Sequence, residues 1–194
     1  AYDMVYNGFA FSEKIGEPIL LRMVTRLAHS RSGVEQKAQQ VQKEISFSED
    51  PRQFILLPGN ARKRYKVLLE RQAEFIEASE SSPYNKYIDG PNKKMGIIAC
   101  GIGYNYLMEN YPDGCEYPVL KIGQYPLPKK QLLQLVKACD EILVLEDGQP
   151  FVEKQLKGYL GIGVKVKGRL DGTLSQDGEL NPDSVARAVG KENK

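Results

Sequence analysis

The sequence predicts an α/β fold, a three-layer domain in which helices cover a mostly parallel sheet. Three apolar runs carry this prediction, because each is short enough to be a buried strand. They are Met95–Cys100, Pro118–Ile122 and Ile142–Glu146. Segments with helical spacing separate them, as in sheets whose parallel strands are joined by covering helices. The first run breaks at Gly101 and Gly103, which predicts a strand, a turn and a helix in succession.

Composition limits the function before any motif is considered. The chain has 194 residues, 41% of them apolar, which suits one large domain or a domain with a substantial extension. Its 27 basic and 25 acidic side chains nearly balance, so no nucleic-acid partner is expected. No apolar stretch approaches the roughly 20 residues that span a bilayer, and no secretory signal opens the chain. Three cysteines in apolar surroundings suggest reduced core residues of a cytoplasmic protein with no membrane partner.

The N-terminal part predicts a helix, a turn and a strand. Apolar residues recur at helical spacing over Tyr2–Lys14, and Gly16 suits the helix stop. The apolar run Ile19–Thr25 is expected to be a strand, followed by a basic loop that contains His29. Such a unit resembles the end of an α/β domain, so we expect an internal piece of a longer polypeptide. With no second histidine, we interpret His29 as structural or as part of a contact surface.

The middle of the chain predicts a linker and one long helix. Residues 36–60 are mostly polar, and prolines interrupt them, so they are expected to form a linker that crosses a surface, with some packed apolar residues at Phe54–Leu57. From Asn60, a candidate N-cap, to Ala78 the apolar residues recur at intervals of three and four, which predicts one amphipathic helix. Residues 79–93 read as an irregular lead-in to the central strand.

The C-terminal part predicts strands and helices in alternation. After a short helix over Tyr104–Asn110, the expected elements are strand Val119–Ile122, helix Lys129–Cys139, strand Ile142–Leu145, a helix from Pro150 to Lys157, strand Val164–Lys167 and a terminal helix that begins at Asn181 and Pro182.

Two motifs invite a chemical interpretation. Gly101 and Gly103 follow a strand, as in dinucleotide-binding turns, but the third small residue of that fingerprint is replaced by Tyr106. A phosphate on the helix N-terminus and an ordinary tight turn both remain open for these glycines. Glu146 and Asp147 end a strand, where they either cap the next helix or form a charged pair at a domain contact.

No catalytic constellation stands out in this sequence. One histidine and cysteines without C-x-x-C spacing cannot supply an ordinary zinc or cluster site, nor a nucleophile with its base. We therefore predict no catalytic, cofactor-binding or metal-binding residue, and we expect the segment alone to be inactive.

Seven separated patches occur in the same order as in one known family. They are Glu13–Arg22 with Thr25–Arg31, Leu57–Arg62, Glu80–Asn85, Gly96–Tyr106, Leu120–Gly123 with Tyr125–Pro128, Val144–Asp147 and Gly178–Leu180. Together they resemble the alpha subunits of indolepyruvate ferredoxin oxidoreductases, and the resemblance covers essentially the whole chain.

The resemblance implies a function for the complete protein. The family oxidatively decarboxylates arylpyruvates with coenzyme A and uses thiamine diphosphate, magnesium and iron–sulfur clusters to reduce ferredoxin. It implies that residues 1–35 end a pyrimidine-binding domain, residues 36–93 are a linker with a long helix, and residues 94–194 form a transketolase C-terminal-like domain. The cofactor sites of the family lie outside this segment, so the partners implied here are the other domains of the subunit, the beta subunit and ferredoxin.

Contacts to those domains are expected near Tyr104, Asn105 and Glu146. His29, Gly101, Gly103 and Asp147 are further candidates for interdomain or pocket contacts. A second hypothesis is a stand-alone α/β module that binds a nucleotide such as coenzyme A at the Gly101 turn. A third is a scaffold without a ligand, supported by the long helix.

Overall fold

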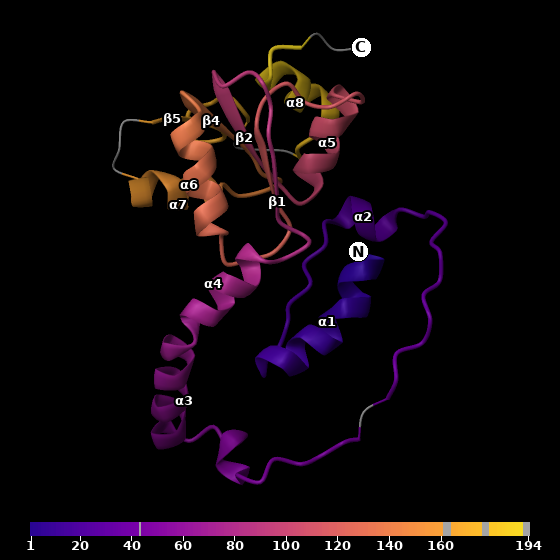
Figure 1. The fold of residues 1–194 in the computed structure, drawn as a ribbon, viewed down its shortest axis with the longest axis vertical. Coiled ribbons are helices and arrows are strands. Elements are labelled where there is room, and N and C mark those ends of the chain that lie inside the picture. Colours follow the sequence, from indigo (N-terminus) through magenta and orange to yellow (C-terminus); the bar gives the residue numbers. More distant parts are fainter. Residues whose placement is uncertain (43, 161–163, 176–178, 192–194) are drawn as a thin grey trace. The chain divides into compact units, whose positions relative to one another are not determined.

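The computed structural model describes residues 1–42, 44–160, 164–175 and 179–191. The chain forms two compact units, residues 1–50 and residues 51–194 (Figure 1), and each is described by itself. Part of the predicted patch Gly178–Leu180 lies outside the described residues. The domain limits expected after residues 35 and 93 stay predictions.

A five-stranded sheet forms the centre of the second unit. Its strands are β1 (Lys86–Ile88), β2 (Met95–Cys100), β3 (Val119–Ile122), β4 (Glu141–Leu145) and β5 (Lys165–Lys167). Their spatial order is β1-β3-β2-β4-β5, and β1 alone among these strands is antiparallel to its neighbour. The predicted α/β class with a mostly parallel sheet is therefore confirmed.

Helices cover both faces of the sheet, which makes three layers (Figure 1). Helices α5 (Ile102–Asn110) and α8 (Pro182–Ala188) pack on one face, where Ile97 and Leu143 are fully buried. Helices α6 (Lys129–Ala138) and α7 (Phe151–Leu160) contribute to the core on the other face. The two cores lie on opposite faces because successive residues of a strand point to opposite sides.

Strand β1 was not predicted, and its stretch was expected to be irregular. With three residues, it is too short to show a period of two in the sequence. It pairs at the sheet edge, with Tyr87 opposite Leu120.

The predicted start of the last helix is confirmed, because the Asn181 side chain accepts a bond from the N–H of Ser184 in a capping box.

The single long helix expected from Asn60 to Ala78 is wrong in its start and its continuity. Two helices occupy this stretch, α3 (Pro58–Glu70) and α4 (Gln72–Glu80). Pro58 begins α3, since the first helical position needs no N–H bond. The helices meet at Arg71, whose φ of −84° and ψ of −2° interrupt the helical path.

The first unit consists of two helices and extended chain. Helix α1 (Tyr2–Ile15) ends at Gly16, whose left-handed φ of 61° confirms the predicted stop. The strand expected at Ile19–Thr25 is wrong, because residues 17–24 are not in a strand and Thr25 begins helix α2 (Thr25–His29). A strand needs a neighbouring strand for its backbone hydrogen bonds, and the described residues of this unit contain no strand that could pair with residues 19–25.

Gly103 provides a test of how closely α5 packs on the sheet. A Cβ atom at this position would lie 2.9 Å from the carbonyl oxygen of Leu145 and 3.3 Å from a methyl carbon of Leu180. Because the closer atom is backbone, we expect Gly103→Ala to lower the free energy of unfolding by about 1–3 kcal/mol in urea denaturation.

Gly158→Ala is the matched control for this substitution. Gly158 lies within α7, and a Cβ atom there would meet nothing within 4 Å. Alanine is favoured over glycine in helices, so this variant should be as stable as the original chain or up to about 1 kcal/mol more stable. Equal stability of the two variants would contradict a packing role for Gly103.

Candidate functional site

The carboxyl ends of the parallel strands bring most of the candidate residues to one edge of the sheet. Cys100, the last residue of β2, is in register with Ile122, the last residue of β3. Gly101, Gly103, Tyr104 and Asn105 follow β2, and Glu146 with Asp147 follows β4. His29 is an exposed residue at the end of α2 in the other unit.

Glu146 caps helix α7 from within the protein. Its carboxylate accepts bonds from the N–H groups of Val152, at 2.7 Å, and Glu153, at 3.0 Å. The side chain is 6% exposed, and this burial raises its pKa, while the two N–H groups partly oppose the shift. The capping interpretation of Glu146 is thus confirmed, and the carboxylate is not available as an exposed charge.

Asp147 was expected to cap the same helix, and the structure gives it another partner. One of its carboxylate oxygens accepts a bond from the N–H of Leu180 at 3.1 Å. Asp147 therefore holds the segment that leads into α8, because a buried or half-buried N–H group needs an acceptor.

A buried acid and a buried arginine continue the polar interior at this edge. The Glu153 carboxylate, 1% exposed, accepts the N–H of Leu170 at 3.0 Å and pairs with Lys157 at 3.1 Å. Arg169, 3% exposed, donates to the carbonyl oxygens of Glu146 and Ser175. These bonds tie the loop after β5 to the end of β4 and to the first turn of α7.

The two glycines after β2 have structural roles. Gly101 adopts a φ of 52°, which a side chain would strain, and it is the N-cap of α5. Gly103 is buried against the end of β4. Beyond the turn, the Tyr104 ring lies under the Lys121 ammonium group at 4.7 Å, whereas Asn105 is exposed.

Asn85 organises a second polar cluster at the same edge. Its carbonyl oxygen accepts the N–H groups of Gly123 and Gln124 at 2.9 and 3.0 Å. Its amide group donates to the carbonyl and hydroxyl oxygens of Ser79 and to the carbonyl oxygen of Gln124. Ser82 donates to the Gln124 side chain at 2.6 Å. The buried Asn85 thereby holds the loop after β3 against the end of α4.

An aromatic pair is exposed beside these clusters. Tyr125 and Phe151 are 49% and 54% exposed, and their rings meet edge to face with centroids 5.7 Å apart. The Cys100 thiol near Tyr125 has a raised pKa, chiefly because of burial and then because of the Glu146 charge. A protonated, buried thiol is a poor nucleophile, so Cys100 is not a catalytic candidate.

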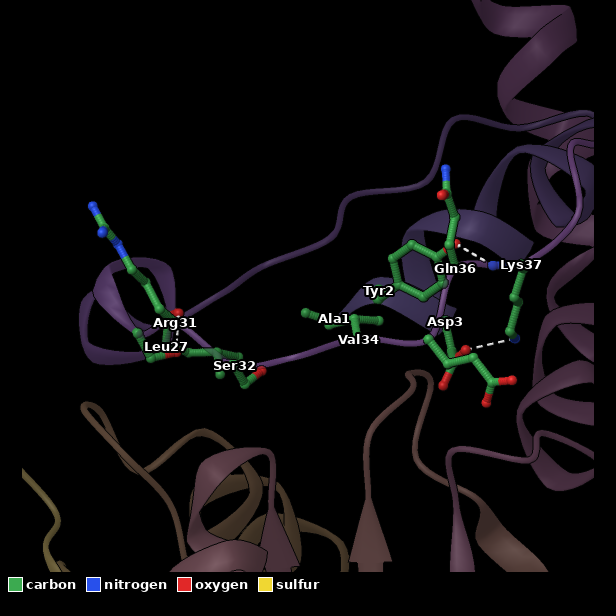
Figure 2. A pocket seen from close by; sticks show the side chains of 11 residues that line it. Ala1, Tyr2, Asp3, Leu27, Arg31, Ser32, Val34, Gln36 and Lys37 are labelled. Carbon is green, nitrogen blue, oxygen red and sulfur yellow. Dashed lines mark hydrogen bonds and ion pairs between the residues drawn. The ribbon is translucent and has the colours of Figure 1, made fainter.

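An open hollow of about 960 Å³ lies within the first unit (Figure 2). The 11 residues that line it come from the start of α1 and from residues 27–37, and all of them are exposed. Asp3 and Lys37 form an ion pair of 2.5 Å at its side, which lowers the pKa of Asp3 and raises that of Lys37. With no buried polar group among those lining residues, the hollow does not have the features of a ligand site.

Several residues of these clusters were missed in the sequence. Asn85 and Ser79 lie in a stretch rich in turn-forming residues, which predicts a loop but not a buried network. Arg169 and Glu153 carry charges that normally indicate exposed positions. The available signal in the sequence was the resemblance of the patches Glu80–Asn85, Tyr125–Pro128 and Val144–Asp147 to one family. In the structure, these three patches meet at this edge.

Two classes of site are absent from the described part of the chain. Within residues 1–42, 44–160, 164–175 and 179–191, no three His, Cys, Asp or Glu side chains are placed to hold a metal ion. Over the same residues, no helix has the length and apolar character that crossing a bilayer requires.

The sheet and its carboxyl-end edge define a three-layer α/β domain in which most of the described polar groups at the strand ends bond to other groups of the same domain.

No protein-family model matches the chain. Curated proteins named indolepyruvate oxidoreductase subunit IorA are similar to it. The match to the protein of Methanothermobacter thermautotrophicus is 31% identical and covers 96% of the present chain. The match to the Archaeoglobus fulgidus protein is 34% identical over 98% of the present chain, and the match to the Pyrococcus abyssi protein is 33% identical over 87% of it.

These matches confirm the resemblance found from the seven patches. The chain spans about a third of the length of the curated relatives, with 31% of the Methanothermobacter protein and 28% of the Pyrococcus protein covered. It is similar to one part of an oxidoreductase subunit.

Replacing Asn85 tests the cluster at the loop after β3. Asn85→Ala leaves the N–H groups of Gly123 and Gln124 without their acceptor, so we expect a loss of about 2–4 kcal/mol in the free energy of unfolding. Asn92→Ala removes a half-buried side chain that donates to Glu116 and accepts the N–H of the exposed Lys94, and it should cost at most about 1 kcal/mol because water can replace these partners. Similar losses in the two variants would contradict the organising role of Asn85.

The pH dependence of unfolding tests the burial of Glu146. Because its pKa is raised above the ordinary 4.5, its carboxyl binds a proton more tightly in the folded state than in the unfolded state. The stability that it contributes is full below the ordinary pKa and is lost as the pH rises through the raised pKa. The original chain should therefore lose stability relative to Glu146→Gln, in urea denaturation, as the pH rises above the ordinary pKa of 4.5. A difference between the original chain and Glu146→Gln that stays constant or grows with pH would contradict the assignment.

Proposed function

We propose that this chain is the structural, interdomain part of the alpha subunit of an indolepyruvate ferredoxin oxidoreductase. The observation that carries the proposal is the similarity to IorA proteins across 87–98% of the chain. The three-layer fold and the placement of three shared patches at one sheet edge support it.

In this proposal, the complete enzyme oxidatively decarboxylates indolepyruvate and other 2-oxo acids with coenzyme A. The products are acyl-coenzyme A, carbon dioxide and reduced ferredoxin. Thiamine diphosphate, magnesium and the iron–sulfur clusters are bound by other parts of the subunit, and the beta subunit and ferredoxin are its partners.

Among the residues that the structure describes, the cysteines and Glu146 do not fit an iron–sulfur cluster or a magnesium ion. Iron–sulfur clusters need several thiolates, but Cys100 and Cys139 are buried in the core and Cys115 is half-buried. Magnesium needs carboxylate oxygens, but both oxygens of Glu146 accept backbone N–H groups. We therefore assign no catalytic step to this segment.

What the segment contributes is a rigid edge for contact with other domains. The internal bonds of Asn85 and Glu146 hold the loops after β3 and β4 in place. Tyr125 in the loop after β3 and Phe151 at the start of α7 are each about half exposed, and the exposed Asn105 lies in α5. Aromatic side chains on a rigid base are typical of protein contacts.

The alternative function, a stand-alone module for coenzyme A or another nucleotide, has weaker support. It depended on Gly101 and Gly103, and both now have structural explanations. In addition, Tyr106 is buried where that fingerprint needs a small residue.

The reading frame around this segment tests the proposal directly. Because the chain covers about a third of its relatives, we expect an open reading frame roughly three times as long, with thiamine and cluster motifs outside this segment. A start codon directly before Ala1 together with a stop codon directly after Lys194 would contradict the proposal.

Calorimetric titration separates the two functions. We expect neither coenzyme A nor thiamine diphosphate to give saturable heat with the 194-residue chain. Micromolar binding of coenzyme A that Gly103→Glu abolishes and Gly158→Glu leaves intact would favour the ligand-binding module instead.

A further inference from the structure

Helix α6 begins without a cap of its own. Its N-cap residue is Pro128, which makes no side-chain cap bond, and its first turn contains no acid. The exposed Lys129 and Lys130 occupy that turn, although positive charges near a helix N-terminus oppose the macrodipole. The N–H groups of this turn therefore depend on an acceptor from outside the helix, either water or another part of the chain.

Glu80, at the end of α4, supplies that acceptor. The end of α4 lies beside the start of α6 (Figure 1). The Glu80 carboxylate accepts the N–H of Lys130 at 2.5 Å, and the Glu80 carbonyl oxygen accepts the side-chain amide of Gln131 at 3.0 Å. The carboxylate also brings a negative charge to the positive end of α6. The cap of α6 thus comes from a residue 50 positions earlier in the chain.

The same end of α4 holds the loop after β3. The hydroxyl group of Ser79, a fully buried residue, is within hydrogen-bonding reach of the carbonyl oxygens of Gln124 and Pro126. The buried Asn85 then links Ser79 to the N–H group of Gly123. The loop is therefore fixed to α4 by side chains that water does not reach.

One buried atom shows that the contact between α4 and α6 is not fully satisfied. The side-chain oxygen of Gln131 is buried, and no group among the described residues bonds to it. Turning the amide does not remove the problem, because the oxygen would then face the carbonyl oxygen of Glu80. A buried acceptor without a donor costs free energy, which contact with water returns. The closed contact therefore carries a cost that opening removes.

We propose that residues 79–85, the α4 latch, couple the first turn of α6 to the loop after β3. In the closed latch, Glu80 caps α6 while the buried residues beside it hold the loop that carries Tyr125. Displacement of α4 breaks both sets of bonds together, so it uncaps α6 and loosens the aromatic pair at the sheet edge. The latch goes beyond the proposed function, because it rests only on bonds within the second unit.

Native-state hydrogen exchange of the 194-residue chain, followed by NMR, tests the latch. The amides of Lys130, Gly123 and Gln124 should open together, and more often than the buried amides of β2, because the latch opens without unfolding the sheet. Glu80→Ala should speed the exchange of all three by the same factor of about five or more, the loss expected for a helix cap. The two loop amides bond to Asn85 and not to Glu80, so only a shared opening produces this result.

Two further variants serve as controls. Glu77→Ala removes an exposed acid from the same helix and should leave the three rates unchanged. Glu80→Gln keeps a side-chain oxygen as acceptor and should speed exchange less than Glu80→Ala does. Faster exchange at Lys130 with unchanged rates at the two loop amides would reduce Glu80 to a local cap and overturn the latch. Opening no more frequent than that of β2 would also overturn it.

The reverse experiment starts from the other set of bonds. Asn85→Ala removes the acceptor of the two loop amides, and the Lys130 amide should then exchange faster by about tenfold or more, because coupling between two sites is reciprocal. Asn92→Ala, outside the latch, should leave the Lys130 rate unchanged. An unchanged Lys130 rate in Asn85→Ala would overturn the coupling, whatever the reading frame shows about the enzyme.

Discussion

The parallel pairing of β2 with both β3 and β4 is the interaction on which the rest of the second unit depends. All six residues of β2 are buried, so its backbone groups have no access to water and must bond to the two neighbouring strands. This pairing places the ends of three strands at one edge. It also separates the two apolar cores, because alternate residues of β2 point to opposite faces.

The chemistry at that edge is mainly structural. Buried polar groups need partners, and here the partners are backbone N–H and carbonyl groups of loops that lie far apart in the sequence. Asn85 bonds to residues 123 and 124, and Arg169 bonds to the carbonyl oxygen of Glu146. These internal bonds hold the loops at this edge against one another.

Much of the fold could be predicted because the buried strands are short and mainly apolar runs. Strand β3 was predicted with its observed bounds, and β2 with both of its ends. The strand at residues 19–25 failed because an apolar run does not reveal whether a neighbouring strand exists. The break at Arg71 was missed because apolar spacing continues across it. Of the candidate site, the position of Glu146 was predictable, whereas the role of Asn85 depends on residues about 40 positions away.

The three thiols differ in how far the fold shields them. Cys100 and Cys139 are buried on the same face of the sheet, whereas Cys115 is half-buried, and burial raises the pKa of all three thiols. Thiolate, the reactive form, is therefore scarce at all three positions while the domain is intact, and the buried side chains of Cys100 and Cys139 are also covered from solvent. The rate at which these two cysteines react with a thiol reagent becomes a built-in measure of how often the sheet opens, and an oxidant would meet Cys115 first.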